Sequence, residues 1–175
     1  MKKALALSTL ALAMSFGVSA AEVKEDKHGF GLSVGYSTFV AGDLEELDGT
    51  PLTIGGNYTL KNGVLIGFDY TSKLIDDHFY SHNISSGIET SLFSPYIGVE
   101  LENGFRVMGG IAFAMADATI TINGKSFADD EVTAGLMAGL GYVSNKGVTV
   151  DGKFSFVEVG GFDGVVGTVS VGYKF

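Results

Sequence analysis

Six charged residues stand at alternate positions within otherwise apolar segments, and they are the first candidates for chemistry. They are Asp69, Glu100, Arg106, Asp151, Lys153 and Lys174. Charges that leave water need partners. Glu100 and Arg106 flank residues 102–104 at equal distances, which places them opposite each other if that segment is a tight turn. The pattern predicts a polar ion-pair network on the inner side of a closed sheet.

A second candidate is the segment 76–85, which gathers histidines, serines and carboxylates, the side chains that an acyl hydrolase uses. Eight-stranded lipid A deacylases carry a His-x-Ser motif on a lipid-facing strand. Here Ile84 stands two residues after His82 and Ser85 follows it, so the spacing departs from that motif. His78 and His82 lack the fixed ligand geometry of a metal site. We expect no catalytic residue, no bound cofactor and no metal.

Acidic residues gather in three segments that we expect to be loops, at 40–50, 73–87 and 119–131. Carboxylates there could share divalent cations with lipopolysaccharide phosphates. A solvated anionic surface explains them with fewer assumptions.

The elements that position these residues are strands with period-two alternation. They are expected at 30–38, 51–60, 64–71, 93–101, 105–115, 132–142, 148–156 and 165–175. Short Asn-containing turns at 61–63, 102–104 and 145–147 alternate with longer connections at 40–50, 73–87, 119–131 and 160–164. Bacterial barrels combine short periplasmic turns, long external loops and an even number of strands. We therefore expect an all-β, eight-stranded antiparallel transmembrane β-barrel with an up-and-down meander and both termini in the periplasm.

Two local irregularities are expected. Pro95 cannot donate to a ladder, so a bulge or an unpaired amide is expected there. The alternation changes phase at residues 119–122, which indicates a hairpin that projects past the membrane, with its tip at 123–131.

The final strand places Val169, Val171, Tyr173 and Phe175 on one face, and the chain stops inside it. An unprotected edge invites aggregation in water, whereas pairing with the first strand removes it. With this strand and its architecture, the mature chain resembles the small outer-membrane barrels of Gram-negative bacteria, the class of OmpX and the OmpA membrane domain. The resemblance implies that these four residues form the signal read by the outer-membrane assembly machinery.

Composition agrees with export to an envelope. Lys2 and Lys3, an apolar stretch at 4–16 and the small residues at 18–20 predict a signal peptide at 1–20, a periplasmic lead-in at 21–29 and the barrel domain at 30–175. Mean hydropathy is +0.30, yet no later apolar run approaches the roughly 20 residues of a membrane helix. The chain has no Cys, so a disulfide framework is excluded. Its net charge of −9 argues against nucleic acid.

The sequence therefore predicts a monomeric, non-enzymatic protein of the outer membrane that acts through its surface loops and its packing in the membrane. Its expected partners are outer-membrane lipid, lipopolysaccharide, the assembly machinery and an external molecule at loops 40–50, 73–87 and 119–131. Two alternatives stay open: a lipid A-modifying acyl hydrolase, and a narrow small-solute channel through an interior that inward glycines leave partly unfilled. Eight strands leave an interior that side chains can fill, which favours a blocked lumen over the channel.

Overall fold

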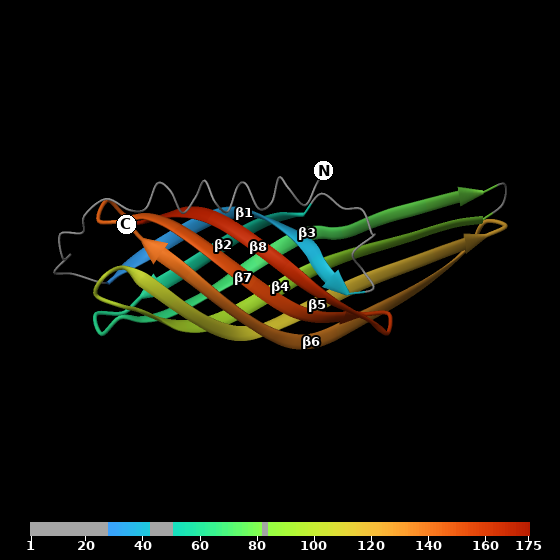
Figure 1. Cartoon of the computed structure of the whole chain (residues 1–175). Helices are drawn as coiled ribbons and strands as arrows, with labels where there is room; N and C mark the ends of the chain where they lie inside the picture. Colours follow the sequence, from blue (N-terminus) through green and yellow to red (C-terminus); the bar gives the residue numbers. More distant parts are fainter. Residues whose placement is uncertain (1–27, 43–50, 82–83) are drawn as a thin grey trace.

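The protein forms a closed barrel of eight antiparallel strands in meander order (Figure 1), as the alternation predicts. The computed structural model describes residues 28–42, 51–81 and 84–175. The strands are β1 (Gly29–Gly42), β2 (Leu52–Thr59), β3 (Val64–Ser81), β4 (Ile84–Glu100), β5 (Phe105–Ile122), β6 (Lys125–Val143), β7 (Val148–Val159) and β8 (Phe162–Lys174). The predicted signal peptide and nearly all of the lead-in lie outside the described residues. Those residues contain no helix long and apolar enough to cross a membrane.

The barrel closes between its first and last strands. Leu32 pairs with Tyr173, Val34 with Val171 and Tyr36 with Val169. The amide of Phe175 also donates to the carbonyl of Phe30 at 2.8 Å. The last strand therefore has no free edge, and the predicted ring is confirmed.

The three tight turns lie together at one end of the barrel, which we call the turn end; the C-terminus lies there too (Figure 1). Gly63, Gly104 and Gly147 have φ values of 81°, 82° and 85°, a conformation that glycine adopts without steric cost. In the first two turns the Asn side chain accepts the amide hydrogen two residues on, at 3.2 Å for Val64 and 3.1 Å for Phe105. Because these bonds are local, an Asn residue in a short segment between two alternating runs was enough to predict these turns from the sequence.

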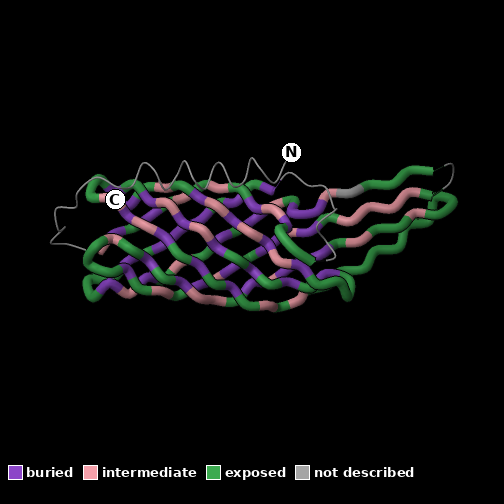
Figure 2. The backbone as a smooth tube through the Cα atoms, viewed as in Figure 1, coloured by how far each residue is buried: buried purple, intermediate pink, exposed green. Residues whose placement is uncertain are grey.

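Buried and exposed residues alternate along the barrel strands (Figure 2), and period-two alternation places the exposed side chains on one face of the sheet and the buried ones on the other. The outer face is apolar on all eight strands, with Leu32, Ile54, Ile66, Ile97, Ile111, Leu136, Phe154 and Val171 among its exposed side chains. The inner face carries most of the buried polar residues. This arrangement is the reverse of a water-soluble fold and is the one a bilayer requires.

Four strands continue well beyond the rest of the barrel at the opposite end (Figure 1). We call this four-stranded sheet the extension and define it as residues 75–81, 84–90, 116–122 and 125–131. Two predictions were therefore wrong: 73–87 and 119–131 are mainly paired strand rather than loop. The turn joining β5 and β6 is Asn123–Gly124, with φ of 51° and 78°, and the expected tip at 123–131 is otherwise strand.

The backbone phase does not slip at 119–122. The ladder between β5 and β6 runs without a shift from Phe105↔Tyr142 to Ile122↔Lys125. What changes there is which face of the sheet carries the apolar residues. The connection 160–164 likewise shortens to a turn at Gly160 and Gly161, after which β8 begins at Phe162. Residues 43–50 of the expected first loop lie outside the described part of the chain.

Of the two alternatives expected at Pro95, the bulge is absent from both ladders, whereas the ladder with β5 does lose its pairing there. Pro95 stays in register with Phe68, and on its other side the ladder is interrupted between Phe93↔Phe113 and Tyr96↔Gly110 without a change of register. An irregularity instead occurs in β3, where the register shifts between Thr71 and Ile75. Lys73 has a φ of 53° there, so that Leu74 and Ile75, although consecutive, are both buried, at 2% and 0% exposure.

Candidate functional sites

Glu100 is the centre of a buried ion-pair group at the turn end of the lumen. Its Oε2 accepts from Arg106 Nη2 at 2.9 Å and Nε at 3.1 Å, and its Oε1 lies 2.7 Å from Lys174 Nζ. Thr59 Oγ1 donates to the same carboxylate at 3.2 Å. Arg106 is completely buried. The pairing of Glu100 with Arg106 across the 102–104 turn is the geometry that the equal spacing predicted.

The other predicted lumen charges form a second group nearer the middle of the barrel. Lys153 Nζ lies 2.5 Å from Asp69 Oδ2 and 4.4 Å from the centre of the Tyr96 ring. Asp151 Oδ2 lies 3.9 Å from Arg106 Nη1, which links the two groups. Sequence reasoning missed Tyr96 and Thr59, although both stand at inward positions of their strands.

A layer of hydroxyl groups lies next to these charges, on the side away from the turn end. Ser37 Oγ lies 2.6 Å from Thr53 Oγ1 and 2.7 Å from Thr168 Oγ1, and Thr53 lies 2.8 Å from Thr71. The four side chains come from β1, β2, β3 and β8, so they tie together the part of the wall where the first and last strands meet.

An apolar cluster fills the lumen between this hydroxyl layer and the extension. Its members, each no more than 7% exposed to solvent, include Phe39, Leu74, Ile75, Leu92, Ala114, Val157 and Val166. Tightly packed apolar side chains exclude water and ions. Among the described residues, the lumen is therefore polar toward the turn end and blocked by hydrocarbon toward the extension.

The extension reverses the polarity of the barrel wall. Directly paired residues lie on the same face of a sheet, and the outer face here carries Asp76, His78, Tyr80, Ser85, Gly87, Glu89, Asp117, Thr119, Thr121, Ser126, Ala128 and Asp130. The inner face carries six large apolar residues, Phe79, Ile84, Ile88, Ile120, Ile122 and Phe127, beside the polar residues Ser81, Ser86, Lys125, Asp129 and Glu131. Phe79 and Phe127 are 61% and 63% exposed. Large apolar groups left open to solvent on one face indicate an interaction surface.

Four carboxylates form a row straight across the outer face of the extension. Asp76 is paired with Glu89, Glu89 with Asp117, and Asp117 with Asp130. Asp76 also binds Lys73 Nζ at 2.8 Å and His78 Nε2 at 3.0 Å. The hydrogen bond from Lys73 lowers the pKa of the Asp76 carboxyl, and the same bond raises the pKa of Lys73.

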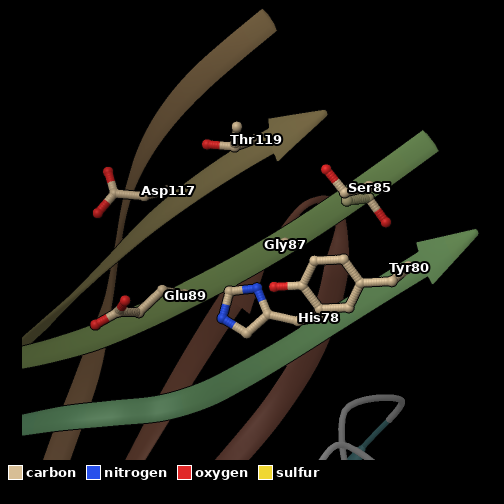
Figure 3. A pocket seen from close by; sticks show the side chains of 8 residues that line it. His78, Tyr80, Ser85, Gly87, Glu89, Asp117 and Thr119 are labelled. Atoms are coloured by element: carbon tan, nitrogen blue, oxygen red, sulfur yellow. The ribbon is translucent and has the colours of Figure 1, made fainter. Parts of the chain in front are cut away.

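A shallow hollow of about 250 Å³ lies on the outer face beside this row (Figure 3). His78, Tyr80, Ser85, Glu89, Asp117 and Thr119 line it. Ser85 and His78 share the hollow, yet no hydrogen bond joins them in the described structure, and His82 lies outside the described residues. The described His, Asp and Glu side chains include no group of three arranged to hold a metal ion.

A closed eight-stranded barrel with an apolar outer wall and a polar interior defines the class of outer-membrane β-barrel proteins. Residues 8–175 match the family model described as outer membrane protein beta-barrel domain, and the chain belongs to that family. No curated protein matches the sequence.

Solved structures with the same fold include two of Ail, the attachment invasion locus protein of Yersinia pestis. One, in complex with the heparin analogue sucrose octasulfate, has a TM-score of 0.70 and 14% identity over 85% of this chain and 99% of that one. The other has a TM-score of 0.66 and 16% identity over 84% and 99%. Neisserial surface protein A has a TM-score of 0.51 and 15% identity over 86% and 98%. At these identities the similarity establishes the fold, that of Gram-negative outer-membrane barrels.

Proposed function

We propose that the protein is a non-enzymatic outer-membrane surface protein that binds an external partner through its extension. In this proposal the turn end and both termini face the periplasm, and the extension stands outside the cell. Short turns at one end and long strands at the other support this orientation, because bacterial barrels have short periplasmic turns and longer external segments.

The observation that carries the proposal is the exposed apolar inner face of the extension. A sheet that only anchored the barrel would gain nothing from leaving Phe79, Phe127 and Ile84 open to water. Covering them with a partner removes that apolar area from solvent, which favours association.

Charge indicates the kind of partner. The extension contains seven acidic residues and one lysine, Lys125. Ail has been crystallised with a polyanionic heparin analogue, but an extension as acidic as this one repels polyanions. A basic or neutral partner fits the surface, and contact with lipopolysaccharide phosphates would need intervening cations.

The predicted site residues have supporting roles in this proposal. The lumen network of Asp69, Glu100, Arg106, Asp151, Lys153 and Lys174 holds the wall rigid around a blocked interior. Val169, Val171, Tyr173 and Phe175 act earlier, as the signal that the assembly machinery reads before the barrel closes. The protein works as a monomer, since its β-edges within the barrel are all paired.

The two alternatives have less support. A channel would need a continuous polar path, and the apolar cluster around Leu74, Ile75 and Val166 interrupts it. A lipid A hydrolase would need a His, a Ser and a carboxylate converging on the lipid-facing wall, whereas Ser85 lies on the extension. Planar-bilayer conductance and mass spectra of lipid A from expressing cells test these alternatives directly.

The proposal is tested with a trimmed variant in which residues 76–88 and 118–129 are replaced by two short turns. Cells that express the full chain or the trimmed variant at equal surface density are applied to wells coated with individual purified extracellular proteins. The full chain should promote attachment to at least one basic protein, and the trimmed variant should not. Equal attachment by both, with both showing the heat-modifiable gel shift of a folded barrel, would contradict the proposal.

A further inference from the structure

The hollow on the outer face of the extension has two chemically different sides (Figure 3). His78 and Tyr80 form one side along β3, with ring centres 6.3 Å apart and ring planes inclined by 26°. Glu89 on β4 and Asp117 on β5 supply carboxylates on the other side, and Ser85 and Thr119 supply hydroxyl groups. An aromatic wall facing two carboxylates is unlike the apolar inner face that carries the proposed function.

The aromatic wall is held in place by the residues around it. The imidazole of His78 is fixed by Asp76 at 3.0 Å, and Asp76 is in turn fixed by Lys73 at 2.8 Å. Gly87 lies directly opposite His78 in the ladder, and a Cβ atom at Gly87 would come within 2.5 Å of His78 Nδ1. The ring therefore occupies the space that a side chain at position 87 would need.

Lys73 attracts the Glu89 carboxylate electrostatically, but its hydrogen bond and salt bridge go to Asp76. Glu89 and Asp117 are directly paired across β4 and β5, and like charges so placed destabilise a sheet. Among the described residues, neither carboxylate forms a salt bridge, because Lys73, the cation on this part of the face, is bound to Asp76. A positive group placed between Glu89 and Asp117 would relieve their repulsion.

We propose that this hollow binds a primary ammonium group carried on an aliphatic stem, as in a lysine side chain of an external polypeptide. The carboxylates of Glu89 and Asp117, which are directly paired, and the hydroxyl of Thr119, two residues further along β5, accept its three N–H bonds. Tyr80 and His78 receive the stem, and the Tyr80 ring adds a cation–π attraction. Among the described residues no three His, Asp or Glu side chains are arranged to hold a metal ion, and two carboxylates alone give too few ligands for calcium.

This inference rests on the proposed function, since it names the chemistry of one contact with the external partner. A polypeptide that places a lysine in the hollow would reach the acidic outer face, while its apolar residues are free to reach the inner face around the sheet edge. Free amines such as polyamines carry the same chemical group, so the experiment must separate the two sources.

The test titrates the full barrel, reconstituted in phospholipid nanodiscs, and follows the NMR signals of the His78 and Tyr80 rings. The probes are acetyl-Lys-Lys-Lys-amide, the same peptide acetylated on every Nζ atom, spermidine and calcium chloride. We expect the lysine peptide to shift both ring signals and the acetylated peptide to leave them unchanged.

Variants then assign the contacts. Glu89→Gln combined with Asp117→Asn should weaken peptide binding at least tenfold, whereas the control pair Asp129→Asn with Asp163→Asn, which removes two exposed carboxylates outside the hollow, should change it less than twofold. Tyr80→Leu should weaken binding about two- to fivefold through loss of the cation–π contact. Its control, Phe79→Leu, alters the neighbouring residue on the opposite face and should have no such effect.

Each other outcome is informative. Binding of spermidine without the peptide would support the ammonium site and exclude the polypeptide source. Ring shifts with calcium alone, or equal weakening by both carboxylate pairs, would overturn the inference. Failure of the proposed function would be recognised separately. It would appear as equal attachment of the full chain and the trimmed variant, which is measured without the titration.

Discussion

The extension continues four of the eight strands of the barrel wall, β3 to β6, yet its outer face is polar where that of the wall is apolar. On β5 the outward side chains are apolar from Phe105 to Met115 and polar from Asp117 to Thr121. The inward side chains of β5 are apolar apart from Arg106 near the turn end, and in the extension they end with the exposed Ile120 and Ile122. The register between β5 and β6 continues without a break, so the change along β5 reflects a change of solvent and not of strand pairing.

This comparison shows how one sheet can serve two environments. In the wall, hydrocarbon outside requires apolar side chains, and polar groups find partners inside. Beyond the wall, both faces meet water, and an apolar face there is stabilised only if something covers it. The extension therefore keeps the wall's strand pairing and uses its two faces for binding.

The largest expected effect separates a buried carboxylate from an exposed one on the same strand. Glu100→Gln leaves Arg106 and Lys174 with a weakened partner inside the lumen, and should cost about 3–5 kcal/mol of unfolding free energy. Glu89→Gln, on the extension, should change stability by no more than about 0.5 kcal/mol. Urea unfolding in detergent micelles, followed by the gel shift, measures both. Equal effects would mean that the Glu100 network does not hold the wall together.

A second pair places the same charge on the outer face of β6 at two heights. Ala138→Arg introduces a cation on the apolar wall and should destabilise the barrel by about 2–4 kcal/mol in a lipid bilayer. Ala128→Arg introduces it on the polar outer face of the extension and should be nearly neutral. Reversible unfolding from phospholipid vesicles gives both values. A similar loss of unfolding free energy at the two positions would contradict the claim that the outer face meets lipid in the wall and water in the extension.

A smaller gain is expected from relieving repulsion in the acidic row. Asp117→Asn removes a charge that stands directly between Glu89 and Asp130. The variant should be more stable by about 0.2–1 kcal/mol at low salt, and the gain should shrink as salt screens the row. Unfolding midpoints at two ionic strengths measure it. A loss of stability at both would show that the row is already neutralised.

The smallest effect concerns pH. Because Lys73 lowers the pKa of the Asp76 carboxyl, this ion pair is fully formed above the ordinary aspartate pKa and is lost only as pH falls through the lowered value. An NMR titration of the Asp76 carboxyl should show the depressed pKa, and Lys73→Met should raise it toward the ordinary value. Lys73 is exposed and Asp76 is partly exposed, so we expect no measurable change in global stability. An unchanged Asp76 pKa in the variant would remove Lys73 as the cause.

The barrel was predictable because its signals are local. Alternation assigned the faces of each strand, and in two of the three tight turns the Asn side chain accepts a hydrogen bond from the amide two residues on. The opposition of Glu100 and Arg106 followed from counting away from one turn. Each of these inferences depends only on residues that are close in the sequence. Each also assumes that a whole strand lies in one environment, with lipid on one face and the lumen on the other.

The number of strands predicted a blocked lumen, but the extension and the particular apolar residues that block the lumen were not predictable in the same way. Alternation shows which residues share a face but not which solvent that face meets, so the reversal at Ile120 and Ile122 was interpreted as a phase slip. Polar residues at 73–87 were interpreted as loop for the same reason. The irregularity at Lys73, which turns Leu74 and Ile75 inward together, depends on tertiary packing. The hollow could not be found because its residues come from three strands whose pairing was not foreseen.

The most direct test of the account follows the outward positions of β5 one by one. The chain has no Cys, so single cysteines at 107, 109, 111, 113, 115, 117, 119 and 121 can each carry a spin label without further changes. In nanodiscs, we predict preferential access of lipid-soluble oxygen at every position through 115. An abrupt change to preferential access of a water-soluble nickel complex should follow at 117. Oxygen preference that continued through 121, or a gradual change without a boundary, would contradict the reversal of environment between wall and extension.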